Sequence, residues 1–200
     1  MEWPLRVRTP IVDGDMVLRP YNAERDSPHL FRVLDDPIVW LHIPGGAPDS
    51  AATLATRFAR RLAGGLRSTW VIEVAGDVVG TSSFILDPDD DAGVEIGSTY
   101  LSPLLWGSGV NRRAKRLMAS AAFDDGAAWV QFRTDERNLR SAAAILKLGA
   151  VELAAREDRW IRTDGTQRVS RFFRLFQAFD ASDITFRVVR RGADARSLVP

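Results

Sequence analysis

The sequence predicts an α/β protein built on a central twisted mixed sheet of about six or seven strands, with about four helices on both faces. Two observations predict it. The spacing of apolar residues changes along the chain between the three-to-four-residue repeat of helices and the alternation of strands. Residues that cap helices or form turns fall where the spacing changes. The predicted order is strand, two helices, three strands, helix, strand, helix and two strands.

The first part of the chain is expected to form one strand and two helices. Met16 and Leu18 lie on one face of the first strand-like run. Ser27 followed by Pro28 has the pattern of an N-cap and a first helical residue, so the first helix is expected to begin there. The expected ranges are 16–21 for the strand, 27–36 for the first helix, and from Asp49 or Ser50 to a pair of glycines for the second.

The rest of the chain predicts six strands and two helices. The dipeptides Gly76-Asp77 and Asp164-Gly165 are turn signals between strand-like runs. Asn138 is a good N-cap for the last helix. The expected strands lie at 69–75, 78–86, 93–101, 129–133, 151–162 and 167–176, and the expected helices at 109–125 and 138–149.

One domain is expected over residues 1–176, because a chain of 200 residues suits a single α/β core. The tail over residues 177–200 has one short strand-like run and no helical stripe. We expect this tail to be disordered or to pack on a partner, and the second alternative allows for a homodimer.

Composition argues against several classes of protein. The formal charge is +1, whereas nucleic-acid binders usually carry a strong basic excess, so no nucleic-acid partner is expected. The chain has no cysteine and two histidines, His29 and His42, which argues against a metal site and fits a reducing compartment. No apolar run approaches the roughly 18 residues that span a bilayer, and the N-terminus lacks the apolar core of a secretion signal. We therefore expect a cytoplasmic protein that binds no membrane.

A short glycine-containing loop, Trp106 to Asn111, connects a strand to an amphipathic helix. Its glycines let the backbone approach a ligand, and the N–H groups of the first helical turn are free donors at the positive end of the helix dipole. This arrangement suits a phosphate anion. The basic residues that follow would neutralise further phosphate charge; they are Arg112, Arg113, Lys115 and Arg116. Two simpler alternatives stay open: the glycines form an ordinary turn, and the basic residues occupy a solvated helix face.

A family resemblance is carried by three runs of sequence: VEIGSTYLSPLLWGSGVNRRAKRLM, VQFRTDERNLRSAAAILKLGA and REDRWIRTDGT. Their order and spacing resemble the GNAT N-acetyltransferase superfamily, and within it the ribosomal-protein N-terminal acetyltransferases of RimJ/RimL type. The resemblance covers residues 10–176 and is strongest over residues 94–166. It implies the GNAT fold, with a sheet that splays between its fourth and fifth strands. It also implies acetyl-coenzyme A (acetyl-CoA) as the cofactor and an amine as the acceptor.

The resemblance assigns the loop before the third helix to the pyrophosphate of coenzyme A, and the start of the next helix to its pantetheine arm. The implied cofactor-binding residues are Tyr100, Leu101, Trp106, Gly107, Ser108, Gly109, Val110, Asn111, Arg112, Asn138 and Ser141. Two positions depart from the superfamily pattern, which has Arg or Gln in place of Trp106 and a small residue in place of Asn111. Asn138 has an alternative role as a helix cap, with Ser141 as the third helical residue, and both roles can hold together.

Acetyl transfer to an amine needs a base, a donor to the carbonyl oxygen and a proton source for the departing thiolate. Glu95 is the candidate base, because related enzymes carry an acidic residue proposed for this role at its position. The alternative is an exposed strand residue. Backbone N–H groups near residues 100–102 would polarise the carbonyl at a bulge. Many relatives have a tyrosine in the last strand, where this sequence has Phe173, so Ser141 or a water would have to supply the proton.

The acceptor site is expected between the first two helices and the last hairpin. Its candidate residues are Trp40, His42, Arg159 and Trp160. Trp40 has a simpler alternative as a core residue. A peptide N-terminus, a small amine and an antibiotic all stay open as acceptors. A second class of function also stays open, a coenzyme-A-binding protein with little catalysis, because Phe173 cannot donate a proton.

Overall fold

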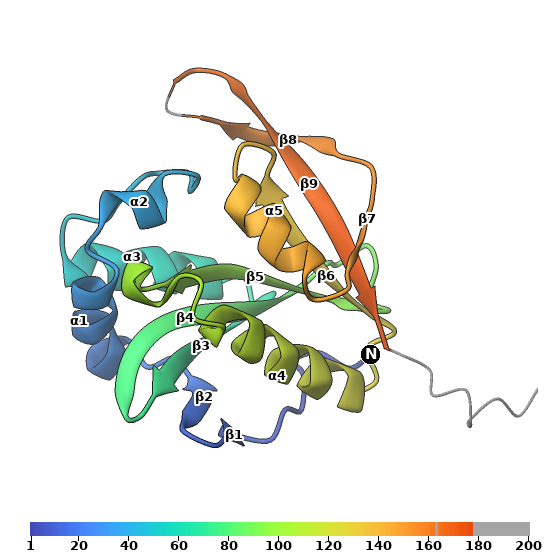
Figure 1. The fold of residues 1–200 in the computed structure, drawn as a ribbon, viewed down its shortest axis with the longest axis horizontal. Coiled ribbons are helices and arrows are strands. Elements are labelled where there is room, and N and C mark those ends of the chain that lie inside the picture. Colours follow the sequence, from blue (N-terminus) through green and yellow to red (C-terminus); the bar gives the residue numbers. More distant parts are fainter. Residues whose placement is uncertain (163, 178–200) are drawn as a thin grey trace, which may run out of the picture.

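The computed structural model describes residues 1–162 and 164–177 (Figure 1). The described residues form nine strands and five α-helices. The strands are β1 (Ile11–Asp13), β2 (Met16–Pro20), β3 (Arg67–Val74), β4 (Asp77–Leu86), β5 (Val94–Leu101), β6 (Trp129–Asp135), β7 (Val151–Glu152), β8 (Arg156–Ile161) and β9 (Gln167–Phe176). The helices are α1 (Ala23–Val33), α2 (Pro37–Trp40), α3 (Ala51–Leu62), α4 (Val110–Asp124) and α5 (Leu139–Leu146), with a short 3-10 helix, η1, at Pro103–Leu105. The predicted mixed α/β fold is confirmed.

The strands form one mixed sheet in the order β1-β2-β3-β4-β5-β6-β9-β7, with β8 paired to β9. The β5–β6 pair is parallel, whereas the other described pairs are antiparallel. The parallel pair has registers at Val94–Val130 and Glu95–Gln131, and beyond them the two strands diverge (Figure 1). This divergence is the predicted splay between the fourth and fifth strands, counted without the short β1.

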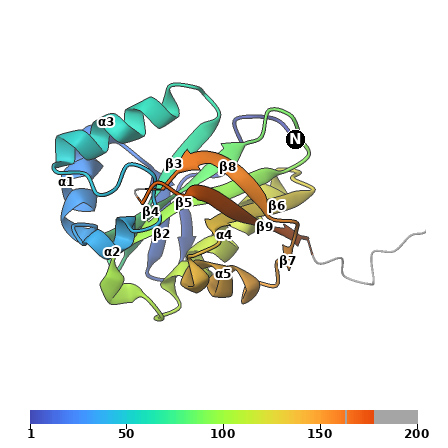
Figure 2. The same cartoon turned by 90° about the horizontal axis from the view of Figure 1, so that it is seen from above.

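Helices cover both faces of the sheet, with α1 and α3 on one side and α4 and α5 on the other (Figure 2). Each face has its own apolar core. The core under α1 and α3 includes Leu30, Leu54, Phe58, Val71 and Tyr100. The core under α4 and α5 includes Ile96, Met118, Phe132, Ile145 and Phe173. Strand β5 therefore contributes side chains to both cores, Ile96 to one and Tyr100 to the other.

Helix α1 begins earlier than the sequence indicated. Asn22 is its N-cap and accepts a hydrogen bond from the Arg25 N–H at 2.9 Å. The expected cap at Ser27 is therefore wrong, and Pro28 lies inside the helix. Ser27 is buried, with its hydroxyl oxygen 2.5 Å from that of Tyr21. Asparagine and serine are equally good caps, so the tertiary contacts of the residues between them decided which one is used.

Three further elements differ from expectation. Strand β1 and the single-turn helix α2 were not expected, and the strand expected over 151–162 is divided into β7 and β8. Asp36 caps α2 by accepting a hydrogen bond from the Ile38 N–H at 2.9 Å. Between β7 and β8 the chain remains attached to β9, because the Leu153 N–H donates to the Phe172 carbonyl at 2.8 Å.

Residues 178–200 lie outside the described part of the chain, so the tail over 177–200 stays a prediction, as do the single domain over 1–176 and the homodimer. Within the described residues, no helix has both the length and the apolar character needed to cross a bilayer. The same residues contain no group of three or more His, Cys, Asp or Glu side chains placed to hold a metal ion.

A buried ion network joins α1 to the sheet. Asp26 is fully buried and accepts hydrogen bonds from Arg19 at 2.9 Å and from the Asn22 N–H at 2.7 Å. Arg19 also donates to Glu73 on β3, at 2.6 and 2.8 Å. Burial by itself would raise the pKa of Asp26, but hydrogen bonds from Arg19, Arg25 and the Asn22 N–H outweigh it and lower the pKa to about 2. The ionised carboxylate thus links α1, β2 and β3.

We expect Asp26→Asn to lower the free energy of unfolding at pH 7 by about 3 kcal/mol, because Arg19 loses a buried counter-charge. The pKa of Asp26 is lower in the folded state, so its stabilising contribution is present above about pH 3.9 and is lost as pH falls toward 2. Urea unfolding at pH 7 and at about pH 3 measures both effects. The exposed Glu24→Gln in the same helix is the matched control, and equal midpoints for the two variants at pH 7 would contradict the prediction.

Candidate active site

Glu95 lies at the last paired position of β5 and β6, where the two strands begin to separate. Its side chain is 12% exposed, and its Oε2 is 3.5 Å from Nε of Arg133 on β6. The carboxylate lies over Gly97, since a Cβ atom at Gly97 would be 2.6 Å from Glu95 Oε1. A larger residue at position 97 would therefore displace the carboxylate. Glu95 thus lies at the mouth of the splay, and its role as a base stays a prediction.

An irregularity in β5 follows Glu95. The β4–β5 register shifts between Thr81 and Ser83, and Ser98 has a positive φ of 48°. The break therefore lies earlier than the bulge expected near residues 100–102. Beyond it, Tyr100 packs in the α1/α3 core and Leu101 is also buried. The Ser102 N–H donates to the Val79 carbonyl at 2.9 Å, so that N–H group is engaged within the sheet.

The loop from Trp106 to Asn111 opens helix α4. Gly107 and Gly109 have φ values of 82° and 93°, which favour glycine, and Gly109 is the N-cap without a side-chain hydrogen bond. A Cβ atom at either glycine would have no other atom within 4 Å, so the space beside the loop is open. Asn111 Oδ1 is buried and has no hydrogen-bond partner among the described residues. The Val110 N–H makes a long hydrogen bond of 3.4 Å to Ser108 Oγ. The open space and the other N–H groups at the start of the helix fit a pyrophosphate.

Trp106 is held by two contacts that the sequence did not indicate. Its Nε1 donates to the Leu101 carbonyl at 3.0 Å. The guanidinium carbon of Arg140, from α5, lies 3.1 Å from the centre of the Trp106 ring. Arg140 therefore brings a positive charge to the loop, at the position where the superfamily pattern has Arg or Gln. The cation comes from another helix, which explains why a search of the loop sequence misses it.

Asn138 and Ser141 open helix α5, next to this loop. Asn138 Oδ1 accepts a hydrogen bond from the Ser141 N–H at 3.1 Å, so Asn138 caps the helix. Both side chains are half-buried. The contact of Arg140 with Trp106 brings the start of α5 beside the start of α4. The two helix starts thus face the same region, and the ligand roles of Asn138 and Ser141 stay predictions.

Lys115 departs from the expected solvated face of α4. Its side chain is buried, and its amine donates to the Ile96 carbonyl at 3.0 Å, one residue after the last β5–β6 pair. The amine also lies 5.1 Å from the centre of the Phe132 ring. Burial lowers the pKa of Lys115 to about 7, against a smaller opposing effect of Glu95. The helical spacing indicates this burial, because Lys115 lies four residues before the buried Ala119 and therefore on the same face of the helix.

The basic residues of α4 therefore have different roles. Arg113 forms ion pairs with Asp13 and with Asp15, the second at 2.6 Å, and so fastens α4 to the β1–β2 hairpin. Arg112 is exposed in the first turn of the helix. Of the four, Arg112 is the one whose position suits a phosphate at the loop.

A cavity of about 250 Å³ lies between the loop after α2 and the β8–β9 hairpin. His42 and Trp160 both line it, together with Asp135 at the end of β6. Burial lowers the pKa of His42, an effect that Asp135 opposes. Asp135 in turn is paired with Arg162 at 2.9 Å. The structure thus brings two of the predicted acceptor residues together.

Trp40, a third predicted acceptor residue, is not among the residues that line this cavity. Trp40 is 3% exposed, and its Nε1 donates to the Leu34 carbonyl at 2.9 Å. Its ring packs on Tyr100 with centroids 4.9 Å apart, so the core alternative for Trp40 is the one observed. The side chain of Arg159 lies outside the described part of the structure.

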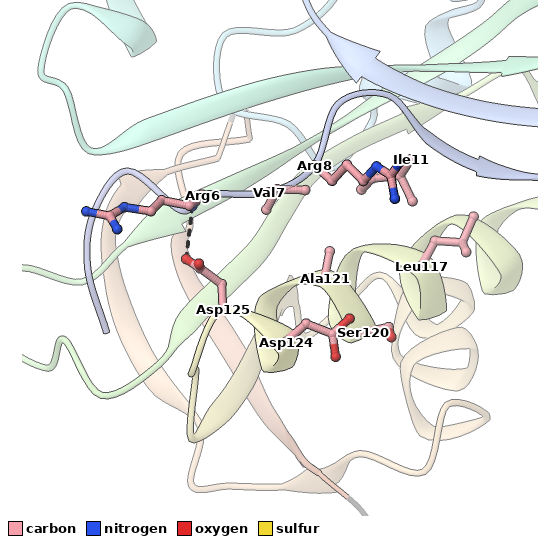
Figure 3. Close-up of a pocket in the computed structure, with 9 residues that line it drawn as sticks. All are labelled: Arg6, Val7, Arg8, Ile11, Leu117, Ser120, Ala121, Asp124 and Asp125. Atoms are coloured by element: carbon pink, nitrogen blue, oxygen red, sulfur yellow. Dashed lines mark hydrogen bonds between the residues drawn. The ribbon is translucent and has the colours of Figure 1, made fainter.

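A second cavity, of about 310 Å³, lies between the N-terminal segment and the C-terminal half of α4 (Figure 3). There the Arg6 N–H donates to Asp125 at 3.0 Å, and Leu117 and Ala121 face the segment. The cavity is the larger of the two, but it contains none of the predicted site residues. It is therefore not the candidate active site.

Comparison with known families identifies the class of protein. The sequence matches the family model for the acetyltransferase (GNAT) domain over residues 15–151. The chain belongs to the GNAT acetyltransferase family, which confirms the resemblance seen in the three sequence runs. Proteins of this family generally use acetyl-CoA. A search of curated protein sequences gave no significant match.

Three solved structures show the same fold. A GNAT-family protein from Chromobacterium violaceum has a TM-score of 0.78 at 22% identity, over 88% of this chain and 92% of that one. A GCN5-related N-acetyltransferase from Brucella melitensis has a TM-score of 0.77 at 18% identity, over 86% and 80%. The ribosomal-protein-S5-alanine acetyltransferase from Vibrio fischeri has a TM-score of 0.69 at 14% identity, over 86% and 98%. At these identities the likeness concerns the fold alone.

Lys115 gives a test of the buried site. Because its pKa is lower in the folded state than the usual value near 10.4, the folded protein binds fewer protons between about pH 7 and 10. Stability should therefore rise with pH in this window, by up to about 1.4 kcal/mol per pH unit. We expect this rise to be missing in Lys115→Met. Urea unfolding of both proteins at several pH values measures it, and parallel curves would mean that the amine keeps its ordinary pKa.

Proposed function

We propose that the protein transfers the acetyl group of acetyl-CoA to a primary amine, by direct attack of the amine in a ternary complex. The observation that supports this most strongly is the position of Glu95, a partly buried carboxylate where β5 and β6 separate. In α/β sheets such a divergence is a favoured ligand site, because backbone groups lose their partners in the ladder. Family membership supports the acetyl transfer, and the amine acceptor is our inference.

Acetyl-CoA supplies an acetyl group already activated as a thioester. Backbone N–H groups of Asn111 and Arg112 would bind its pyrophosphate at the start of α4, with the Arg112 side chain as a further positive group. Gly107 and Gly109 leave the space for this approach. Arg140, stacked on Trp106, adds charge beside the loop. Asn138 and Ser141 would contact the pantetheine arm from the start of α5.

Glu95 would take the proton of the attacking amine, directly or through a water. Strand β9 contains no tyrosine that could give the thiolate a proton, and Phe173, at the position expected for one, is fully buried opposite Phe132. Ser141, half-buried at the start of α5, is the proposed proton source, with water as its substitute. The same observation favours a second candidate function, a coenzyme-A-binding protein with weak catalysis.

Substitution of Glu95 separates the two candidates. We expect Glu95→Gln to lower kcat by about 10²- to 10⁴-fold, the usual contribution of a general base. Its affinity for acetyl-CoA should change less than about twofold, because the pyrophosphate loop is intact. Calorimetric titration with acetyl-CoA and an assay of released thiol with a panel of amines measure these effects, with the exposed Asp77→Asn as control. Cofactor binding without thiol release in the wild type would favour the second candidate.

Gly97→Ala tests whether the position of the carboxylate matters. The added Cβ would push Glu95 Oε1, which it would approach to 2.6 Å, out of its present position. We expect kcat to fall at least tenfold, with little change in acetyl-CoA affinity, because a misplaced base transfers protons poorly. A circular-dichroism melt shows whether the strand is intact. A correctly folded variant with wild-type kcat would mean that Glu95 is not the base.

A further inference from the structure

Four arginines surround the face of the sheet on which Glu95 lies. Arg57 and Arg61 come from α3, Arg67 from β3 and Arg133 from β6; together they are called the arginine cluster. The strand registers pair Arg67 with Ile85 and Ile85 with Glu95, so Arg67 and Glu95 share one row and one face of the sheet. Their Cα atoms are two strand spacings apart, about 10 Å, which long side chains cross.

The members from α3 and β3 are held by neutral oxygen atoms. Arg67 donates to Ser98 Oγ at 2.7 Å, and Arg61 donates to the Tyr100 hydroxyl at 2.6 Å. Arg57 donates to the Gly46 carbonyl at 2.7 Å and stacks on Trp40 at 5.4 Å. Among the described ion pairs, none joins these three arginines to a carboxylate within 4.0 Å. They are fixed in place without being neutralised.

The cluster is electrostatically one unit with Glu95. Burial lowers the pKa of Arg67, and the positive charges of Arg61 and Arg133 lower it further, while Tyr100 and Glu95 oppose this. Glu95 is the carboxylate in this set, and it is already bonded to Arg133 at 3.5 Å. The other three arginines, Arg57, Arg61 and Arg67, are partly buried and have no carboxylate partner among the described ion pairs, which is unfavourable in a folded protein. Such groups are typical of a site that receives an anion.

We propose that the acceptor amine carries an anionic group, a carboxylate or a phosphate, which Arg61 and Arg67 bind while its amine faces Glu95. The proposal rests on the proposed function, because it places the amine at the candidate base. Because Arg67 and Glu95 lie close together in one row, the anionic group and the amine of the acceptor should be separated by only a few bonds. Polycationic acceptors are disfavoured, since the cluster repels them. The positive field of the arginines also favours the neutral, reactive form of the bound amine.

Matched amines test the acceptor class. O-phosphoethanolamine and ethanolamine differ by a phosphate, β-alanine and β-alaninamide by a carboxylate, and 1,3-diaminopropane carries a second cation. We expect the anionic member of at least one pair to have a kcat/KM about ten- to hundredfold higher, the worth of a charged hydrogen bond, and the diamine to be the poorest acceptor. Comparison of the two pairs distinguishes phosphate from carboxylate. Equal values within both pairs would overturn the proposal.

Variants assign the effect to the cluster. Arg67→Gln and Arg61→Gln should each lower kcat/KM for the anionic acceptor at least tenfold more than they lower it for its neutral partner. Arg67→Lys, which keeps the charge, should retain most of the preference. Arg60→Gln, at an exposed position next to Arg61 in α3, is the matched control. Loss of activity toward both members of a pair would indicate a structural role and contradict anion binding.

A binding experiment separates this proposal from the proposed function. Protein saturated with desulfo-coenzyme A, which blocks the phosphate loop, is titrated calorimetrically with O-phosphoethanolamine and with β-alanine. One outcome is saturable binding that Arg67→Gln weakens tenfold, together with no release of thiol in the acetyl-CoA assay. This outcome would support the anion site and refute the acetyl transfer. No binding of either probe, with active transfer to neutral amines, would refute the anion site alone.

Discussion

The separation of β5 from β6 is the constraint on which the site depends. Two parallel pairs join the strands, and the next residues have no partner across the gap. The Ile96 carbonyl, just beyond the last pair, accepts its hydrogen bond from Lys115, which reaches it from α4 on one face. Glu95, at the last pair, projects to the other face. A backbone opening that would be unfavourable in a continuous sheet is thus stabilised by the Lys115 side chain on one face.

Opposite charges on the two faces of β5 follow from this arrangement. The buried Lys115 amine has few polar neighbours, which lowers its pKa, and the negative charge of Glu95 opposes that effect. Around Glu95, on the other face, the arginines donate mainly to hydroxyl and carbonyl groups. Two other buried carboxylates are paired directly with arginines, Asp26 with Arg19 and Asp135 with Arg162. This contrast supports the proposal that the surface above Glu95 receives an anionic ligand.

Local signals predicted those parts of the chain whose structure depends on neighbours in sequence. Asn138 caps its helix as expected, and Ser50, one of the two candidates, caps the earlier one. Each accepts a hydrogen bond from the N–H three positions later. The strands on either side of the Gly76-Asp77 turn were also expected, because the turn itself sets their pairing. Where two local signals competed, sequence reasoning failed: Asn22 and Ser27 both resemble caps, and the buried network of Asp26 decided between them.

The sequence by itself determined the mixed α/β fold, the GNAT family and the glycine loop before α4, because these depend on periodicity and on motifs of a few residues. The tertiary structure decided which side chains meet. It placed Trp40 in the core and Lys115 under β5, and brought Arg140 from α5 onto Trp106. It also gathered Arg61, Arg67 and Arg133 around Glu95 from three separate elements. Such contacts join residues far apart in the chain, and only the packing of helices on the sheet sets the distances between them.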